Sequence, residues 1–271
     1  MTESKLITPA EFLVVKHSFL DGNINHGQDT LKKTIDDLLS LEPVVQRKVI
    51  PCFEGDLLTI KETGEIILTH QNFSLPSQAK YQELSELGIA TSLRAVLDKI
   101  QSYQQSNNQR MVLCFELKKP TSVVAIRETI NLLTEYGLAP QDVYFDSFFG
   151  DKLNLVKEIN QELGTNYNFC SLHLIGNAST TQCMVTRPKE YDVLTIPIKL
   201  SFGKLDEPVI YGAVGDEKTL SLIATDPSVQ GAYYRPREGS GLSGLIKMGL
   251  NSISNTVKLR KTHLLSVSGS F

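Results

Sequence analysis

The stretch MVLCFELK, residues 111–118, decides the fold class of this chain. It is apolar on both faces until its last positions, and such strands are typical of a parallel sheet that is covered on both sides. Similar short runs, rich in β-branched residues, recur along the sequence and are separated by helical patterns. The eight candidate strands are residues 12–17, 49–58, 111–118, 142–147, 169–175, 193–198, 209–214 and 231–235.

Amphipathic helices are predicted between these strands. The segment 122–136 is one example, because it follows Pro120 and stops before Gly137, a residue type that favours helix ends. Eight strands that alternate with helices predict an α/β protein of the (β/α)8 TIM-barrel class. An open doubly wound sheet is the alternative, but neither GxGxxG nor GxxxxGK(S/T) occurs at a strand-to-helix turn. The predicted helices are residues 29–40, 91–103, 122–136, 151–163 and 216–224.

The composition indicates one soluble globular domain. Hydrophobic residues make up 41% of the 271 positions and charged residues 21%, which excludes the class of disordered chains. We expect a single domain over 1–271, with a loop insertion at 71–88 and a C-terminal helix or tail at 239–271. The net charge of −3 does not favour a nucleic-acid partner. The oligomeric state is left open.

The start of the chain carries no cationic stretch followed by an apolar run, so no secretory signal is visible and we expect a cytoplasmic protein. Export without a cleavable signal is the alternative. The cysteines at 52, 114, 170 and 183 are widely spaced, and three of them fall in candidate strands. We therefore expect free thiols. No CxxC pair occurs, which argues against structural zinc.

Three acidic residues fall near the ends of candidate strands. Glu54 and Asp56 are two positions apart, so in a strand their side chains share a face, here expected to be the barrel interior near its carboxyl end. Glu116 occupies the same kind of position, and Lys118 follows it on the same face. Any one of them alone is typical of a solvated rim residue. Together, the converging carboxylates favour a divalent cation, Mg²⁺ or Ca²⁺, and Lys118 could contact an anionic substrate or pair with Glu116.

Two histidines also end predicted strands. His17 closes the first strand, and His70 closes a short run that follows a turn at Thr63 and Gly64. Imidazoles carry protons near neutral pH, so a pair beside a metal could act as acid and base in phosphoryl-ester cleavage. His173 lies in an apolar strand and fits either a core histidine or a site residue. The two remaining histidines, His26 and His263, lie in polar surroundings typical of the surface.

These motifs resemble those of the glycerophosphodiester phosphodiesterase superfamily of (β/α)8 barrels, which includes the related sphingomyelinase D-like phospholipases. The family pattern has a strand ending in His-Arg-Gly, a Pro-Glu-Asn-Thr helix start, Glu-x-Asp, His-Asp and a Glu-x-Lys strand. The corresponding segments here are His17-Ser18-Phe19, Gly27-Gln28-Asp29-Thr30, Glu54-Gly55-Asp56, His70-Gln71 and Glu116-Leu117-Lys118. Asp146-Ser147-Phe148 resembles the family's Ser-Phe strand end. The segments 209–214 and 231–236 resemble its last two strands, so the resemblance spans nearly the whole chain.

The resemblance implies a phosphoric diester hydrolase that cleaves a glycerophosphodiester and uses one divalent cation. The cation would polarise a phosphoryl oxygen, and the nucleophile would be water or a neighbouring substrate hydroxyl that yields a cyclic phosphate. The partner is then a small-molecule phosphodiester or lysolipid. The implied site residues are Glu54, Asp56 and Glu116 for the metal, His17 and His70 for acid/base catalysis, and Lys118 for the substrate phosphate.

Several positions depart from the family pattern. Ser18 stands where the family has an arginine on the phosphate, and Gln71 replaces the Asp after the second histidine. Tyr234 and Arg235 stand where Thr-Asp is common. Three alternatives therefore stay open: a phospholipase D-like enzyme acting on a lysophospholipid or sphingolipid, a catalytically inactive barrel that binds a phosphorylated ligand, and another metal-dependent barrel hydrolase or lyase acting on a carboxylate substrate.

The C-terminal segment has an apolar stripe at helical spacing followed by a basic cluster. We favour the interpretation that it is the last barrel helix, packed on the core. The alternative is peripheral contact with an anionic membrane surface, where a lipid substrate would reside. The residues concerned are Leu242, Leu245, Ile246, Leu250, Ile253, Lys258, Arg260 and Lys261.

Overall fold

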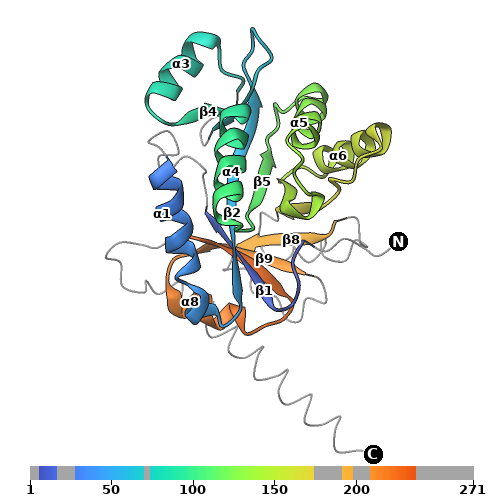
Figure 1. Ribbon diagram of the computed structural model, residues 1–271. Coiled ribbons are helices and arrows are strands. Elements are labelled where there is room, and N and C mark those ends of the chain that lie inside the picture. The colour runs from blue at the N-terminus through green and yellow to red at the C-terminus, as the bar shows by residue number, and fades with distance from the viewer. Residues whose placement is uncertain (1–5, 17–27, 70–73, 174–190, 198–207, 236–271) are drawn as a thin grey trace, which may run out of the picture.

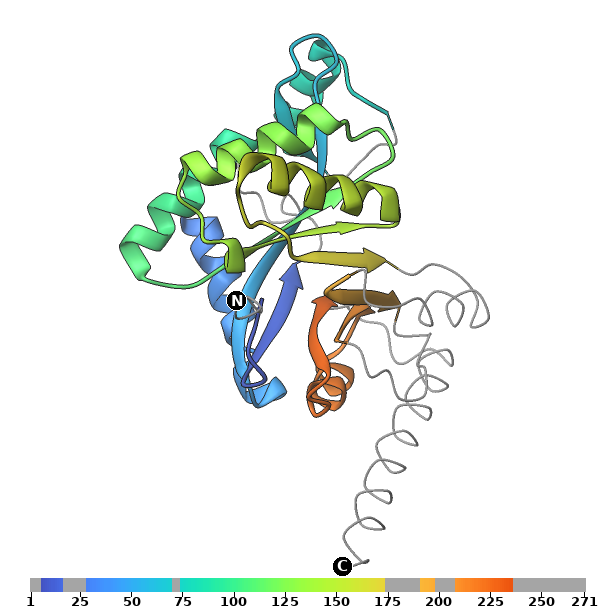
Figure 2. The same ribbon diagram turned by 90° about the vertical axis from the view of Figure 1, so that its right-hand side faces the viewer.

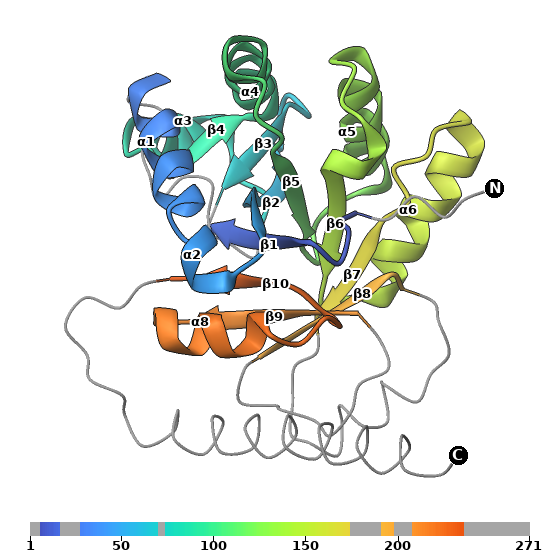
Figure 3. The same cartoon turned by 60° about the horizontal axis from the view of Figure 1, so that its bottom comes forward.

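The computed structural model describes residues 6–16, 28–69, 74–173, 191–197 and 208–235 of the chain. Within these ranges eight parallel strands close into a barrel (Figure 3), which confirms the predicted (β/α)8 fold. Each strand overlaps one of the eight predicted runs. In spatial order they are β1 (Glu11–Lys16), β2 (Lys48–Thr59), β5 (Val112–Leu117), β6 (Val143–Ser147), β7 (Cys170–His173), β8 (Val193–Pro197), β9 (Val209–Val214) and β10 (Val229–Tyr234).

The barrel closes at β1, which pairs in parallel with both β2 and β10. Leu13 is aligned with Ile50 on one side and with Gly231 on the other. A Cβ atom added to Gly231 would lie 2.5 Å from the carbonyl oxygen of Leu13. This seam therefore requires a residue without a side chain, because the two backbones approach too closely for any other.

Helices cover the outside of the barrel (Figure 1), and α4, α5 and α6 lie along one side of it (Figure 2). Three of the helices begin at a residue whose side chain accepts a hydrogen bond from the backbone N–H three positions later: Ser92, Ser122 and Asp216. Gly164 ends another with a φ of 66°, a conformation that glycine adopts without strain. Apart from α3, which belongs to the extension below, the described helices are α1 (Gln28–Leu39), α2 (Glu42–Val45), α4 (Leu93–Asn107), α5 (Val123–Glu135), the short 3₁₀ helix η2 (Pro140–Asp142), α6 (Gly150–Leu163) and α8 (Glu217–Ala224).

A small extension is built onto β2 beyond the barrel (Figure 1). Strand β3 (Ile66–Thr69) runs antiparallel to β2, and β4 (Ala90–Ser92) runs antiparallel to β3. Between them lies helix α3 (Gln78–Glu86), so the stretch 71–88, predicted as a loop insertion, contains a helix. Only Leu84 of this nine-residue helix is buried, and one apolar contact gives too weak a periodic signal to identify it from sequence.

Alternation along the strands divides the core into an interior and an outer layer. Leu13 and Val15 belong to the cluster inside the barrel, whereas Phe12 and Val14 pack in the layer between strands and helices. Leu6, from the segment before β1, joins the interior cluster. Its carbonyl oxygen accepts a 2.6 Å hydrogen bond from Arg110, just ahead of β5. The amino end of the barrel is thus closed by apolar side chains, which leaves the carboxyl end for polar groups.

Cys52, Cys114 and Cys170 are buried free thiols, as predicted. Cys183 and the predicted tail at 239–271 lie outside the described residues. Among the residues that the structure describes, no helix combines the length and apolar character needed to cross a bilayer.

Candidate functional site

Three buried carboxylates meet inside the barrel near its carboxyl end. Glu54 and Asp56 follow Cys52 on the inward face of β2, and Glu116 follows Cys114 on the inward face of β5. Asp56 and Glu116 are register partners on adjacent strands. One carboxylate oxygen from each of Glu54, Asp56 and Glu116 lies within 4.8 Å of the other two. We call these three residues the acidic trio; the sequence predicted their convergence.

Lys118 faces the acidic trio, as the spacing of two from Glu116 predicted. Its ammonium nitrogen lies 3.0 Å from Oδ1 of Asp56 and forms an ion pair with Glu116. The Lys118 backbone N–H donates to the hydroxyl of Thr121, which in turn donates to the carbonyl of Leu57. These two bonds tie the end of β5 to β2, so the position of Lys118 beside the carboxylates is fixed by the backbone.

The charges of this site perturb one another. Burial raises the pKa of Glu116, and the nearby Asp56 carboxylate raises it further, against the opposing effect of Lys118. Burial alone would lower the pKa of Lys118, but the carboxylates of Glu116 and Asp56 outweigh it and the pKa of Lys118 is raised. Lys118 therefore stays protonated at physiological pH.

The acidic trio fits a divalent cation. Its members are at most 5% exposed, and their three negative charges face the single ammonium of Lys118. Together, the three carboxylates and Lys118 leave an excess of two negative charges in a buried space, which one divalent ion would balance. Carboxylate oxygens are the ligands that Mg²⁺ and Ca²⁺ prefer.

A second polar cluster, which the sequence did not predict, lies beside the acidic trio. Asp146 on β6 is fully buried and is the register partner of Glu116. Its Oδ2 atom contacts Nε2 of His173 and accepts a 2.7 Å hydrogen bond from the hydroxyl of Tyr233. We call Asp146, His173 and Tyr233 the Asp146 cluster. The alternation of side chains along β6 could have indicated that Asp146 faces inward, because it lies two positions after the inward-facing Tyr144.

The ring of Phe148 connects the two groups of residues. Its centroid lies 4.4 Å from that of His173 and 5.9 Å from the ammonium nitrogen of Lys118. Burial alone would lower the pKa of His173, but Asp146, and to a lesser extent Glu116, outweigh burial and the opposing Lys118, so the pKa of His173 is raised. The site therefore holds, besides Lys118, a second group whose protonated form is favoured by the neighbouring carboxylates.

The predicted acid/base pair, His17 and His70, lies outside the described residues, so its role stays a prediction. The residues just before them are described. Lys16, the last residue of β1, is aligned with Phe53, and Thr69, the last residue of β3, is aligned with Asp56. His26 and His263 also lie outside the described residues.

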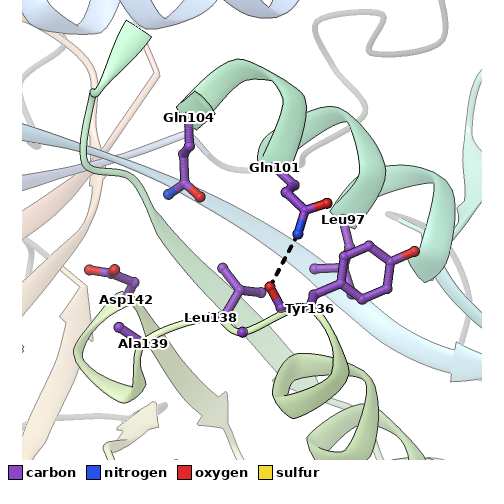
Figure 4. A pocket seen from close by; sticks show the side chains of 8 residues that line it. Leu97, Gln101, Gln104, Tyr136, Leu138, Ala139 and Asp142 are labelled. Atoms are coloured by element: carbon purple, nitrogen blue, oxygen red, sulfur yellow. Dashed lines mark hydrogen bonds between the residues drawn. The ribbon is translucent and has the colours of Figure 1, made fainter. Parts of the chain in front are cut away.

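A separate cavity of about 140 Å³ lies on the outside of the barrel (Figure 4). Gln101 and Gln104, near the end of α4, form one wall, and Leu138 and Ala139, in the turn after α5, form another. Asp142, which directly precedes β6, places this cavity at the amino ends of the strands. It is therefore remote from the acidic trio.

No protein-family model matches the sequence, and no curated protein matches it. Solved structures do match. A proposed glycerophosphodiester phosphodiesterase from Galdieria sulphuraria is 14% identical, with a TM-score of 0.58 over 92% of this chain and 99% of that one. The glycerophosphodiester phosphodiesterase of Agrobacterium tumefaciens is also 14% identical, with a TM-score of 0.52 over 85% and 97%.

An Oleispira antarctica phosphodiesterase, solved with the product sn-glycerol-3-phosphate, is 14% identical, with a TM-score of 0.54 over 83% of this chain and 92% of that one. These likenesses concern the backbone. The chain therefore has the barrel fold of the glycerophosphodiester phosphodiesterases, as the sequence motifs predicted, and its activity has to be argued from its own side chains.

Proposed function

We propose that this protein is a divalent-metal-dependent phosphodiesterase that cleaves a glycerophosphodiester. The observation that carries the proposal is the acidic trio with Lys118 beside it, buried at the carboxyl end of the barrel. Active sites of (β/α)8 barrels lie at that end. The likeness of the fold to a phosphodiesterase solved with sn-glycerol-3-phosphate supports the choice of substrate class.

Glu54, Asp56 and Glu116 would hold one cation, Mg²⁺ or Ca²⁺. When bound, such an ion supplies Lewis-acid polarisation of a phosphoryl oxygen. The protein's part is to keep the three oxygens within 4.8 Å of one another in a buried setting, where a charge on the substrate is felt more strongly than in water.

Lys118 would bind the substrate phosphate. Its ammonium is protonated, mostly buried and held beside the carboxylates, so it can accept a phosphodiester anion without a large rearrangement. The ring of Phe148 lies within cation–π distance of the Lys118 ammonium, which also pairs with Asp56 and Glu116. These contacts restrict where the phosphorus atom can sit, and such positioning lowers the barrier to cleavage.

His17 and His70 are proposed as the acid/base pair. One neutral imidazole would take the proton from the attacking oxygen, which belongs to water or to a neighbouring hydroxyl of the substrate. The other, as imidazolium, would give a proton to the leaving alcohol. Attack by water gives an open phosphomonoester, whereas attack by the substrate hydroxyl gives a cyclic phosphate.

The test is a substrate panel with product identification by phosphorus NMR. The purified protein is incubated with glycerophosphodiesters, lysophospholipids and sphingomyelin, in Mg²⁺, in Ca²⁺ and in EDTA. We expect metal-dependent release of an alcohol from a glycerophosphodiester. Turnover of the lipids alone would assign the phospholipase alternative, and no turnover of any phosphodiester in any ion would contradict the proposal.

Two variants make the assignment specific to the site. Glu116→Gln removes one carboxylate of the acidic trio at nearly constant shape, and we expect a loss of at least about 100-fold in activity. Glu128→Gln, on the exposed face of α5, is the matched control and should keep wild-type activity. Equal activity in the two variants would show that the turnover comes from another site or from a contaminant.

A further inference from the structure

The Asp146 cluster contains a histidine that is hydrogen-bonded through one of its two ring nitrogens. Nε2 of His173 contacts the carboxylate of Asp146, and within the described part of the chain Nδ1 has no hydrogen-bond partner. The His173 side chain is 17% exposed, whereas that of Asp146 is 0% exposed. The ring therefore spans the distance between a fully buried carboxylate and the accessible end of the barrel.

Asp146 is itself fixed in place. It is fully buried, and the Tyr233 hydroxyl, which reaches across from β10, donates to the same Oδ2 atom that contacts His173. Phe148 and Tyr233 also contact the imidazole ring, with centroid distances of 4.4 and 5.8 Å. A histidine constrained by a carboxylate and two aromatic rings has little rotational freedom, so the direction of its Nδ1 atom is set in advance.

His173 and Lys118 lie at the same height along the barrel axis, with β6 between their strands. Glu116 is aligned with Asp146, and Asp146 with Ser171, so the positions two residues further along each strand are Lys118, Phe148 and His173. Phe148 contacts both of the others. Lys118 and His173 therefore flank one ring, on the side of the acidic trio that faces the open end of the barrel.

We propose that His173 is a phosphate-binding residue of this site, held by Asp146 through Nε2 so that Nδ1–H donates a hydrogen bond to a phosphoryl oxygen beside Lys118. The inference rests on the proposed function, because it takes a phosphodiester anion as the ligand. Asp146 is then a positioning residue, since it acts on the substrate only through His173. The raised pKa of His173 is consistent with this role, because a protonated ring is the form that donates from both nitrogens.

Two substitutions separate a phosphate contact from a purely structural pair. In His173→Gln the amide nitrogen takes the place of Nε2, which keeps the bond to Asp146 and removes the donor at Nδ1. In His173→Asn the amide nitrogen takes the place of Nδ1, which keeps that donor and removes the bond to Asp146. Ser171→Ala is the matched control: it lies on the same strand and the same inward face, where its hydroxyl pairs with that of Thr195 at 2.6 Å.

Two readouts are used for the wild type and the three variants: kcat/KM for a glycerophosphodiester in Mg²⁺, and affinity for sn-glycerol-3-phosphate by calorimetry. A contact to the phosphate predicts that His173→Gln loses about 10- to 100-fold in both, more than His173→Asn, while Ser171→Ala stays near wild type. A structural role predicts the opposite order, with His173→Gln the milder variant, and that result would overturn the assignment.

The results for the wild type distinguish failure of the proposed phosphodiesterase function from failure of the proposed phosphate contact of His173. If the wild type turns over no phosphodiester but binds sn-glycerol-3-phosphate, the proposed function fails and the assignment of His173 is judged on affinity alone. If His173→Gln does not fold, the imidazole ¹⁵N resonances of the wild type replace it as the readout. They should move when sn-glycerol-3-phosphate is added, and a His173 resonance that does not move would overturn the contact.

Discussion

Replacing Glu116 by Gln should change protein stability in opposite directions with and without a divalent cation. In EDTA, the ionised Glu116 carboxylate is repelled by Asp56 and Glu54 and attracted by Lys118. At 4.8 Å and an effective dielectric constant of about 20, each carboxylate pair repels by about 3.5 kcal/mol. Burial adds the largest cost to the charge, and the ion pair with Lys118 offsets only part of the total, which agrees with the raised pKa of Glu116.

The neutral variant removes that net cost, in which the ion pair with Lys118 is already counted. We therefore expect Glu116→Gln to stabilise the metal-free protein by about 1–3 kcal/mol, which corresponds to a rise in Tm of about 2–10 °C. In the wild type, Mg²⁺ at 100 times its Kd should add about 2.7 kcal/mol, or about 5–10 °C. The variant should gain almost nothing from Mg²⁺, because one of its three ligands is gone.

Thermal unfolding followed by circular dichroism, in EDTA and across a Mg²⁺ series, measures both effects on the same samples. Glu128→Gln serves as the control and should respond to Mg²⁺ as the wild type does. If Glu116→Gln is less stable than wild type in EDTA and gains the same increment from Mg²⁺, then the carboxylates do not repel one another and do not share an ion. The metal centre would then have to be abandoned.

Three further predictions concern the barrel and the Asp146 cluster. Gly231→Ala should destabilise the protein by about 3 kcal/mol in urea unfolding, because the new Cβ would lie 2.5 Å from atoms of Leu13; an effect below about 0.5 kcal/mol would refute the close approach. Arg110→Met should cost about 2–3 kcal/mol by the same measurement, because it breaks the hydrogen bond to Leu6 in the segment before β1 and the ion pair with Asp142; unchanged stability would show that this segment is held by apolar contacts alone. His173→Gln should be most destabilising below about pH 6.5 and progressively less so as the pH rises through the raised pKa of His173, where the ring charge paired with Asp146 is lost; a difference from wild type that does not vary between pH 5.5 and 9 would contradict the charged pair.

The barrel could be predicted because its signals are local. Each strand is a short apolar run, and alternation within β2 and β5 is enough to place Glu54 with Asp56 and Glu116 with Lys118. Predicting that these side chains converge also needed the rule that parallel strands present their carboxyl ends at the same end of the barrel. The structure agrees with that step, since the three carboxylate oxygens lie within 4.8 Å of one another.

The Asp146 cluster could not be predicted in the same way. The sequence separation between Asp146 and Tyr233 is 87 residues, and their contact depends on how the barrel closes and on the register of β6 with its neighbours. A shift of one residue in β6 would turn Asp146 to the outer layer, and the same shift in β10 would turn Tyr233 away. Helix α3 was missed for a different reason, because a nine-residue helix with one buried side chain leaves almost no periodic pattern.

The alternation of inward-facing and outward-facing side chains along β5 also restricts how the sequence of this protein can evolve. Glu116 and Lys118 face inward, while Phe115 and Leu117 pack in the apolar layer beneath the helices. Inserting or deleting a single codon ahead of Glu116 would exchange the two sets, placing charges among the helices and an aromatic ring among the ligands. Point substitutions can adjust this strand one face at a time, but any alteration in its length would disable chemistry and folding together. Length variation in related chains should therefore be confined to the loops.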